Sequence, residues 1–219
     1  ILRNNYIKEF MNFLICIFIG YLIGAIPASY LIVKLSTGKI LFQEGSGNVG
    51  AMNSYEITQN RYIGIVCGLA DLLKGIISVL LVFYFFSNDL LYSVALFAAV
   101  LGHNFSVFIK FRGGRGLATA AGGMLLINPV WVLLWLLLFY FSKKKISDNV
   151  HINNIIATLF SVAIAYFIPL YFYKITNMPL LMNFSSFKLL ITSIGILIII
   201  KHIKPIRDLL ASGNFSDNP

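Results

Sequence analysis

The stretch Leu117-Ala-Thr-Ala-Ala-Gly-Gly-Met-Leu-Leu-Ile-Asn-Pro-Val-Trp-Val-Leu-Leu-Trp-Leu-Leu-Leu-Phe-Tyr-Phe141 decides how often this chain crosses a membrane. Its 25 residues are enough for one tilted membrane-spanning helix, which takes about 20 residues. However, Asn128-Pro129 lies near its centre, and such a pair commonly starts a turn. The stretch therefore predicts either one long helix or a hairpin of two short helices.

The rest of the chain is also apolar. Of its 219 residues, 58% are hydrophobic and only 11% are charged, and the mean hydropathy is +0.84. This composition predicts an all-α, polytopic membrane protein. The five other stretches long enough to span are residues 11–33, 62–86, 90–109, 152–173 and 187–200.

The distribution of basic residues favours the hairpin. Twelve of the 17 Lys and Arg residues fall in four polar segments. These are Lys34, Lys39 and Arg61; Lys110, Arg112 and Arg115; Lys143, Lys144 and Lys145; and Lys201, Lys204 and Arg207. A hairpin places all four segments on one side, as the positive-inside tendency predicts. We therefore expect seven helices, with the N-terminus outside, the C-terminus in the cytoplasm, and hairpin arms shielded by neighbouring helices because each is short.

The net charge of +9 then reflects topology and attraction to anionic lipids or substrates. No soluble basic module for binding nucleic acid is present in the sequence. Cys16 and Cys67 each lie in an apolar span without ligand spacing, which predicts core packing rather than metal binding or redox chemistry. We expect a single membrane domain over residues 1–219, with no cofactor and no metal.

Two glycine-rich polar segments interrupt the apolar chain, and we expect both to form loops on the cytoplasmic side. We call them the first and second islands. The first island is Gly45-Ser-Gly-Asn-Val-Gly-Ala-Met-Asn53. Its spacing formally matches G-x-G-x-x-G, but a dinucleotide fold needs a soluble strand and helix around it, and these flanks are membrane helices. Two interpretations stay open, a flexible connector or a phosphate site made of bare backbone N–H groups and polar side chains.

The second island, residues 102–119, favours the phosphate site. It is Gly102-His-Asn-Phe-Ser-Val-Phe-Ile-Lys-Phe-Arg-Gly-Gly-Arg-Gly-Leu-Ala-Thr119 and combines a histidine, three cations and a Gly-Gly-Arg-Gly turn. Because both islands fall on the same predicted side, we expect one pocket. His103 alone is typical of a buried, hydrogen-bonded histidine, and Lys110 or Arg112 alone is typical of an interfacial cation.

A third polar feature lies inside a predicted span. Asp71 and Lys74 are three residues apart and share one helical face, so their charges neutralise one another. Charges within a span are costly and usually face the protein interior. A functional role and a structural ion pair beneath the site are both compatible with this spacing.

Together, the two islands and Asp71-x-x-Lys74-Gly75 resemble the bacterial acyl-phosphate:glycerol-3-phosphate acyltransferases. The resemblance covers nearly the whole chain and implies seven helices around a site facing the cytoplasm, in the bacterial cell membrane. It implies transfer of a fatty acyl group from acyl phosphate to the 1-hydroxyl of glycerol 3-phosphate, giving lysophosphatidic acid. It fixes neither the acyl chain nor the oligomeric state.

The resemblance and the chemistry of the islands give each candidate residue a role. Ser46 and His103 are the catalytic candidates, and His103 orients or deprotonates the hydroxyl unless a substrate phosphate takes the proton. Asp71 and Lys74 are supporting residues. The expected substrate-binding residues are Gly45, Gly47, Asn48, Gly50, Asn53, Lys110, Arg112, Gly113, Gly114, Arg115, Gly116, Thr119 and His202.

The chain also departs from the family pattern. Met52 stands where the pattern has Thr, Glu56 where it has Arg, and Arg115 where it has Lys. At the C-terminal motif His202 is kept, but Pro205, Asp208 and Asn214 replace Asn, Arg and Glu; a serine pair is absent near His151 and Asn154.

The departures leave several alternatives. In one, Arg61 or Arg207 takes over anion binding; in another, the chain is a relative with a different acceptor or without catalysis. A transporter of anions is a third alternative, although no paired broken helices mark two related halves.

Overall fold

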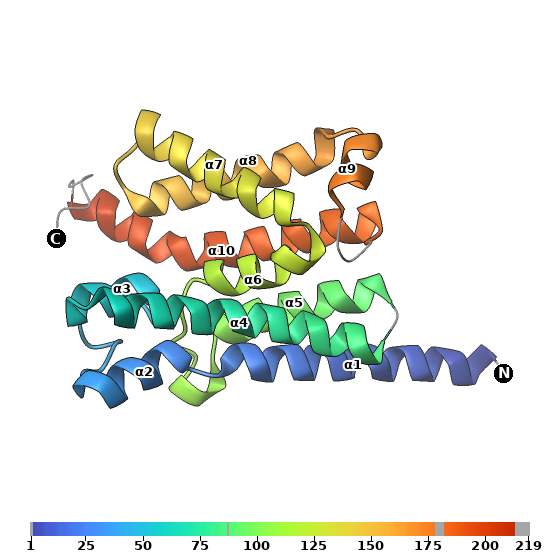
Figure 1. Ribbon diagram of the computed structural model, residues 1–219, viewed down its shortest axis with the longest axis horizontal. Helices are drawn as coiled ribbons and strands as arrows, with labels where there is room; N and C mark the ends of the chain where they lie inside the picture. Colours follow the sequence, from blue (N-terminus) through green and yellow to red (C-terminus); the bar gives the residue numbers. More distant parts are fainter. Residues whose placement is uncertain (1, 87, 178–181, 213–219) are drawn as a thin grey trace. The chain divides into compact units, whose positions relative to one another are not determined.

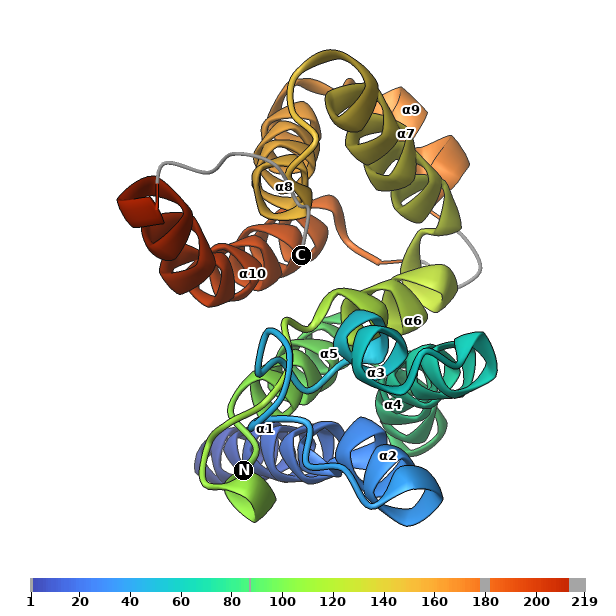
Figure 2. The same ribbon diagram turned by 90° about the vertical axis from the view of Figure 1, so that its left-hand side faces the viewer.

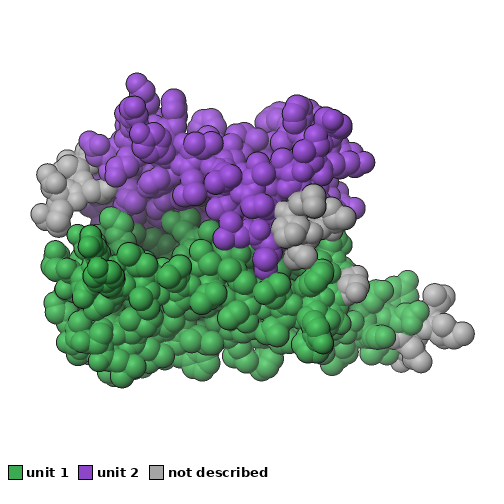
Figure 3. Space-filling view, viewed as in Figure 1, with its two compact units in different colours: residues 1–123 green, residues 124–219 purple. Residues whose placement is uncertain are grey.

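The computed structural model describes residues 2–86, 88–177 and 182–212, and all regular secondary structure in these ranges is helical. It divides into two compact units, residues 1–123 and 124–219 (Figure 3). The expected single domain stays a prediction.

Unit 1 is built on three helices, α1 (Leu2–Ala25), α4 (Arg61–Phe85) and α5 (Asp89–Asn104), which pack against one another (Figure 1). Small residues allow α1 and α5 to approach closely. A Cβ placed on Gly24 would lie 1.9 Å from the carbonyl oxygen of Ala99, and one on Gly20 would lie 2.4 Å from that of Ala95. Such close backbone contact supplies van der Waals attraction, which drives helix association where lipid is as apolar as the side chains.

Proline and polar residues break three of the expected spans. The first span is two helices, α1 and α2 (Ala28–Thr37), because Pro27 interrupts the helix. The span predicted over 90–109 ends as α5 at Asn104, and a 3-10 turn, η1 (Val107–Ile109), follows. The span predicted over 152–173 is α8 (Val150–Phe167) followed, after Pro169, by the short α9 (Leu170–Thr176).

The first island is only partly a loop, which corrects the expectation for residues 51–53. A helix, α3 (Ala51–Thr58), begins directly after Gly50 and therefore contains Asn53. The apolar side of this region forms a buried cluster of Val33, Leu41, Val49, Ile57, Cys67 and Ile109. The expectation that Cys67 packs in a core is confirmed, and Cys16 is buried too.

The apolar stretch of residues 117–141 is broken at Asn128-Pro129, where the sequence predicts a turn. Helix α6 (Leu117–Ile127) ends before Asn128, and α7 (Pro129–Lys145) begins after it. The Asn128 side-chain oxygen accepts a hydrogen bond from the backbone N–H of Trp131 at 3.2 Å, and Pro129 occupies the first helical position. An N-cap followed by proline starts a new helix, so the break is local in origin.

Unit 2 contains α7, α8, α9 and α10 (Phe184–Ser212), and α8 packs against both α7 and α10 (Figure 2). The buried face of α8 is polar. Trp135 Nε1 donates to Thr158 Oγ1 at 3.1 Å, and Ser142 Oγ donates to Asn153 Oδ1 at 2.7 Å. Polar side chains within apolar helices join such helices by hydrogen bonds.

Five segments of the described chain are long and apolar enough to cross a membrane. They are Asn5–Thr37, Arg61–Phe85, Asp89–Ile109, Val150–Phe167 and Phe184–Ala211, and Leu117–Ile127 is a shorter apolar helix. The all-α, polytopic membrane class is therefore confirmed. The count of seven spans and the side on which each loop lies stay predictions.

Candidate functional site

Unit 1 brings the two islands into contact. Val49 of the first island and Ile109 of the second belong to the same buried apolar cluster. A Cβ placed on Gly114 would lie 2.5 Å from the carbonyl oxygen of Val49, so the two backbones nearly touch. The sequence-based expectation that both islands lie together is thus met within this unit.

Asn53 braces the first island from inside. Its side-chain oxygen accepts the backbone N–H of Ser46 at 3.0 Å, and its side-chain nitrogen donates to the carbonyl oxygens of Leu41 and Asn48, both at 3.0 Å. The side chain is almost fully buried. Asn53 therefore acts as a brace for the loop, and its predicted contact with substrate stays a prediction.

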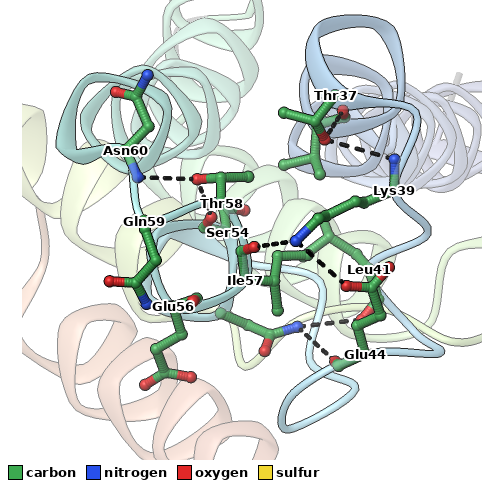
Figure 4. Close-up of polar contacts among 12 residues, drawn as sticks. Thr37, Lys39, Leu41, Glu44, Ser54, Glu56, Ile57, Thr58, Gln59 and Asn60 are labelled. Carbon is green, nitrogen blue, oxygen red and sulfur yellow. Dashed lines mark hydrogen bonds and ion pairs between the residues drawn. The ribbon is translucent and has the colours of Figure 1, made fainter.

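Lys39 ties the loop to the end of α3 (Figure 4). Its Nζ donates to the carbonyl oxygen of Ile57 at 2.5 Å and lies 3.6 Å from a carboxylate oxygen of Glu44. A cation at the C-terminus of a helix is stabilising because it meets the exposed carbonyls. Lys39 and Asn53 thus hold the loop in one shape, while the Ser46 side chain is exposed.

The second island is fixed to the ends of α1 and α5. Tyr21 donates its hydroxyl to the carbonyl oxygen of Phe105 at 2.8 Å, and Ser106 Oγ donates to that of Ala25 at 2.5 Å. The backbone N–H of Gly114 donates to the carbonyl oxygen of His103 at 3.0 Å. A Cβ on Gly113 would meet that same oxygen at 1.9 Å, so the Gly-Gly pair lies directly on the end of α5.

The cations of the second island lie in different surroundings. Lys110 is exposed and has a positive φ of 54°. Arg112 is exposed, and its guanidinium lies 5.6 Å from the ring centre of Phe42. Arg115 is half-buried next to Gly116, whose φ of 81° suits glycine.

Asp71 and Lys74 pair as their spacing predicts. Lys74 Nζ lies 2.8 Å from Asp71 Oδ1, and both side chains are buried. Ser29 Oγ donates to the other carboxylate oxygen at 2.9 Å. The sequence gives no sign of the Ser29 contact, because 42 residues separate the partners.

His103 joins this pair from α5. Its Nδ1 lies 3.5 Å from Lys74 Nζ and 3.5 Å from Asp71 Oδ1. Thr119, predicted as a substrate contact, is buried and donates its hydroxyl to the carbonyl oxygen of Asp71 at 2.9 Å. That bond joins α6 to α4, so Thr119 supports the charged pair.

A small cavity opens beside these groups. It is lined by Lys74, His103, Ser106, Val49, Gly113 and Gly114, together with residues at the end of α1. Both islands and the buried charged group thus line the same cavity. The sequence did not predict Val49 and Ser106 as site residues, although the first island contains Val49 and the second contains Ser106.

His202 lies in unit 2, where it has polar neighbours of its own. Its Nε2 lies 3.0 Å from Asn154 Nδ2, and its Nδ1 lies 2.7 Å from the carbonyl oxygen of Ile198. The His151 and His202 rings meet edge to face, with their centres 5.5 Å apart. The role of His202 as a substrate contact stays a prediction.

The departures from the family pattern lie on two helices. Glu56 lies on α3, and Pro205 and Asp208 lie on α10, while Asn214 is outside the described residues.

Comparison with known proteins places these features in one family. The family model described as Glycerol-3-phosphate acyltransferase matches residues 14–212. Glycerol-3-phosphate acyltransferase 2 of Moorella thermoacetica is 35% identical over 161 residues, covering 74% of this chain and 79% of the relative. Glycerol-3-phosphate acyltransferase of Staphylococcus aureus is 37% identical over 160 residues, covering 68% and 77%.

Two solved structures of a glycerol 3-phosphate acyltransferase have a fold similar to that of this chain. The glycerol 3-phosphate form of PlsY (YgiH), an integral membrane glycerol 3-phosphate acyltransferase, superposes with a TM-score of 0.73 at 30% identity, covering 91% of this chain and 92% of that one. Its lysophosphatidic acid form gives a TM-score of 0.71 at 29% identity. With the two islands in contact and the buried charged group beside them, the chain belongs to the membrane-embedded glycerol-3-phosphate acyltransferase family.

Proposed function

We propose that this chain transfers the acyl group of acyl phosphate to the 1-hydroxyl of glycerol 3-phosphate, releasing lysophosphatidic acid and phosphate. The observation that carries this proposal is the contact between Val49 and Gly114, which sets both glycine-rich islands beside the buried Lys74 and His103. We also propose that this site opens to the cytoplasm, because the positive-inside rule favours the cytoplasmic side for the basic segments, and the second island contains one of them.

The reaction requires that the protein align the two substrates and neutralise the charge of their phosphates. The hydroxyl oxygen attacks the acyl carbonyl carbon, the bond from that carbon to the phosphate oxygen breaks, and the released phosphate takes the hydroxyl proton. Since acyl phosphate is already an activated donor, no covalent acyl-enzyme is required. Positioning two reactants in this way contributes on the order of 7–11 kcal/mol toward lowering a barrier.

The islands supply donors for the two phosphates. Exposed Ser46 of the first island is one, and the second island contributes the cations Lys110, Arg112 and Arg115. Charge-assisted hydrogen bonds to phosphate are about twice as strong as neutral ones. We assign the first island to one phosphate and the cations of the second island to the other.

The test is acyl transfer by purified protein in lipid nanodiscs, with palmitoyl phosphate and radiolabelled glycerol 3-phosphate. We expect labelled lysophosphatidic acid, and none when palmitoyl-CoA or palmitoyl-acyl carrier protein replaces palmitoyl phosphate. Ser46→Ala and Arg115→Ala should each raise the KM or lower kcat without unfolding the protein. Binding of glycerol 3-phosphate without turnover would refute the catalytic proposal, and turnover only with another acceptor would refute the assigned substrate.

A further inference from the structure

His103 has two possible partners on one side of its ring. Lys74 Nζ and Asp71 Oδ1 both lie 3.5 Å from His103 Nδ1. The contact with Lys74 has the geometry of a hydrogen bond, whereas the contact with Asp71 is an approach of two charged or chargeable groups. Which partner Nδ1 engages decides where the ring proton lies.

Lysine decides this question because its ammonium group only donates. A proton on Nδ1 would point at the ammonium hydrogens of Lys74. An unprotonated Nδ1 instead accepts a hydrogen bond from Lys74. In neutral imidazole the other nitrogen then carries the proton, so His103 is the Nε2–H tautomer.

Asp71 already has other partners. Its Oδ2 accepts a hydrogen bond from Ser29 at 2.9 Å, and its Oδ1 lies 2.8 Å from Lys74 Nζ. The carboxylate therefore balances the charge of Lys74 and holds the ammonium in place. This arrangement leaves Lys74 to orient His103.

The Nε2 edge of His103 faces the junction of the islands. A Cβ placed on Gly114 would lie 2.2 Å from Nε2 and 2.5 Å from the carbonyl oxygen of Val49. His103 and Gly114 both line the cavity. Within the described ranges, no hydrogen bond engages Nε2. Its N–H is therefore available to a ligand that enters between the islands.

The geometry points to Lys74 as a positioning residue that holds His103 as a neutral hydrogen-bond donor, so that Nε2–H, rather than a basic nitrogen, meets a carbonyl or phosphate oxygen of the substrate. This inference rests on the proposed function only for the identity of that oxygen. It makes the phosphate leaving group, not His103, the acceptor of the hydroxyl proton.

Nitrogen NMR of histidine-labelled protein tests the tautomer without any activity measurement. The chain has only three histidines, and loss of one signal in His103→Gln assigns the resonance. We expect the wild type to show protonated Nε2 and unprotonated Nδ1. Lys74→Met should remove this preference, and Lys74→Arg, which still donates, should keep it. A wild-type His103 protonated at Nδ1 would overturn the inference.

Ser29→Ala is the matched control for the tautomer measurement. It removes the hydrogen bond to Asp71 Oδ2 but leaves the Lys74 contact with Nδ1 in place. The His103 signals should keep the pattern of the wild type. If Ser29→Ala changes the tautomer as strongly as Lys74→Met does, packing rather than Lys74 sets it, and the inference fails.

Kinetics distinguish a donor from a base. The side-chain amide of His103→Gln places an N–H near the position of Nε2, whereas His103→Leu offers none. Removing one donor to a developing oxyanion costs about 10²–10³ in kcat, so we expect that loss for Leu and a much smaller one for Gln.

Equal loss of kcat in both folded variants would indicate a base and overturn the donor role. A wild type without turnover would refute the proposed function, while the NMR result would still decide the tautomer.

Discussion

The side-chain oxygen of Asn53 accepts the backbone N–H of Ser46, seven residues earlier, at 3.0 Å. The same side chain donates to the carbonyl oxygens of Leu41, Glu44 and Asn48. One buried amide therefore holds both ends of the loop that carries Ser46. The shape of the first island depends on this residue of α3 as well as on Gly45 and Gly47, whose φ angles of 57° and 66° favour glycine.

Asn53→Ala should loosen the first island. Leaving buried backbone groups without their partners costs about 1–3 kcal/mol, so we expect a lower unfolding temperature in detergent and faster proteolysis within residues 38–50. Asn60→Ala is the control, since it removes an exposed N-cap of α4 and should cost about 1 kcal/mol without affecting that loop. Unchanged proteolysis in Asn53→Ala would contradict the brace.

Gly24→Ala should separate α1 from α5. The new Cβ would lie 1.9 Å from the carbonyl oxygen of Ala99, and overpacking of this kind costs about 1–3 kcal/mol. Thermal unfolding in detergent measures the effect. Gly68→Ala is the matched control, because its Cβ would meet Ala51 Cβ at an ordinary 3.4 Å. Equal unfolding temperatures for the two variants would show that the helices adjust freely.

Gly114→Ala should uncouple the islands. Its Cβ would lie 2.2 Å from His103 Nε2, so either the ring or the Gly-Gly turn has to move. We expect kcat for acyl transfer to fall more than the unfolding temperature does. A variant with normal kcat would show that the Val49 and Gly114 junction is not part of the site.

Glu56→Arg tests the main departure from the family pattern. Glu56 is exposed on α3, three residues after Asn53. If its position faces substrate, removing a carboxylate and adding a cation should lower the KM for glycerol 3-phosphate, because attraction to the phosphate replaces repulsion. Assays with several acceptors check this. A loss of activity would instead indicate that Glu56 pairs with a cation or binds a cationic acceptor, and kinetics equal to the wild type would place position 56 outside the site.

Cysteine labelling in intact cells measures which side of the membrane each loop faces. Cys16 and Cys67 are buried, so they should give little background with a membrane-impermeant thiol reagent. Cysteine introduced at Ser46 or Lys144 should be labelled only after the membrane is opened, because the positive-inside rule places both positions in the cytoplasm. Labelling of position 144 from outside would refute the predicted hairpin and indicate six spans.

The amino-acid sequence alone determined the features that depend on local chemistry. The apolar composition specified a helical membrane protein, and Asn128-Pro129 specified the helix break, because an N-cap and a residue without N–H act within one turn. The Asp71 and Lys74 pair also followed from helical spacing. The resemblance that marks the family lies in these same short segments.

Contacts between residues far apart in the sequence depend on how the helices pack. The Ser29 contact with Asp71, the Asn53 brace and the approach of Gly114 to Val49 and His103 all depend on how helices pack. Helix packing is set by the close approach of small residues such as Gly20 and Gly24 across α1 and α5, and no local pattern in the sequence specifies which partner each will meet.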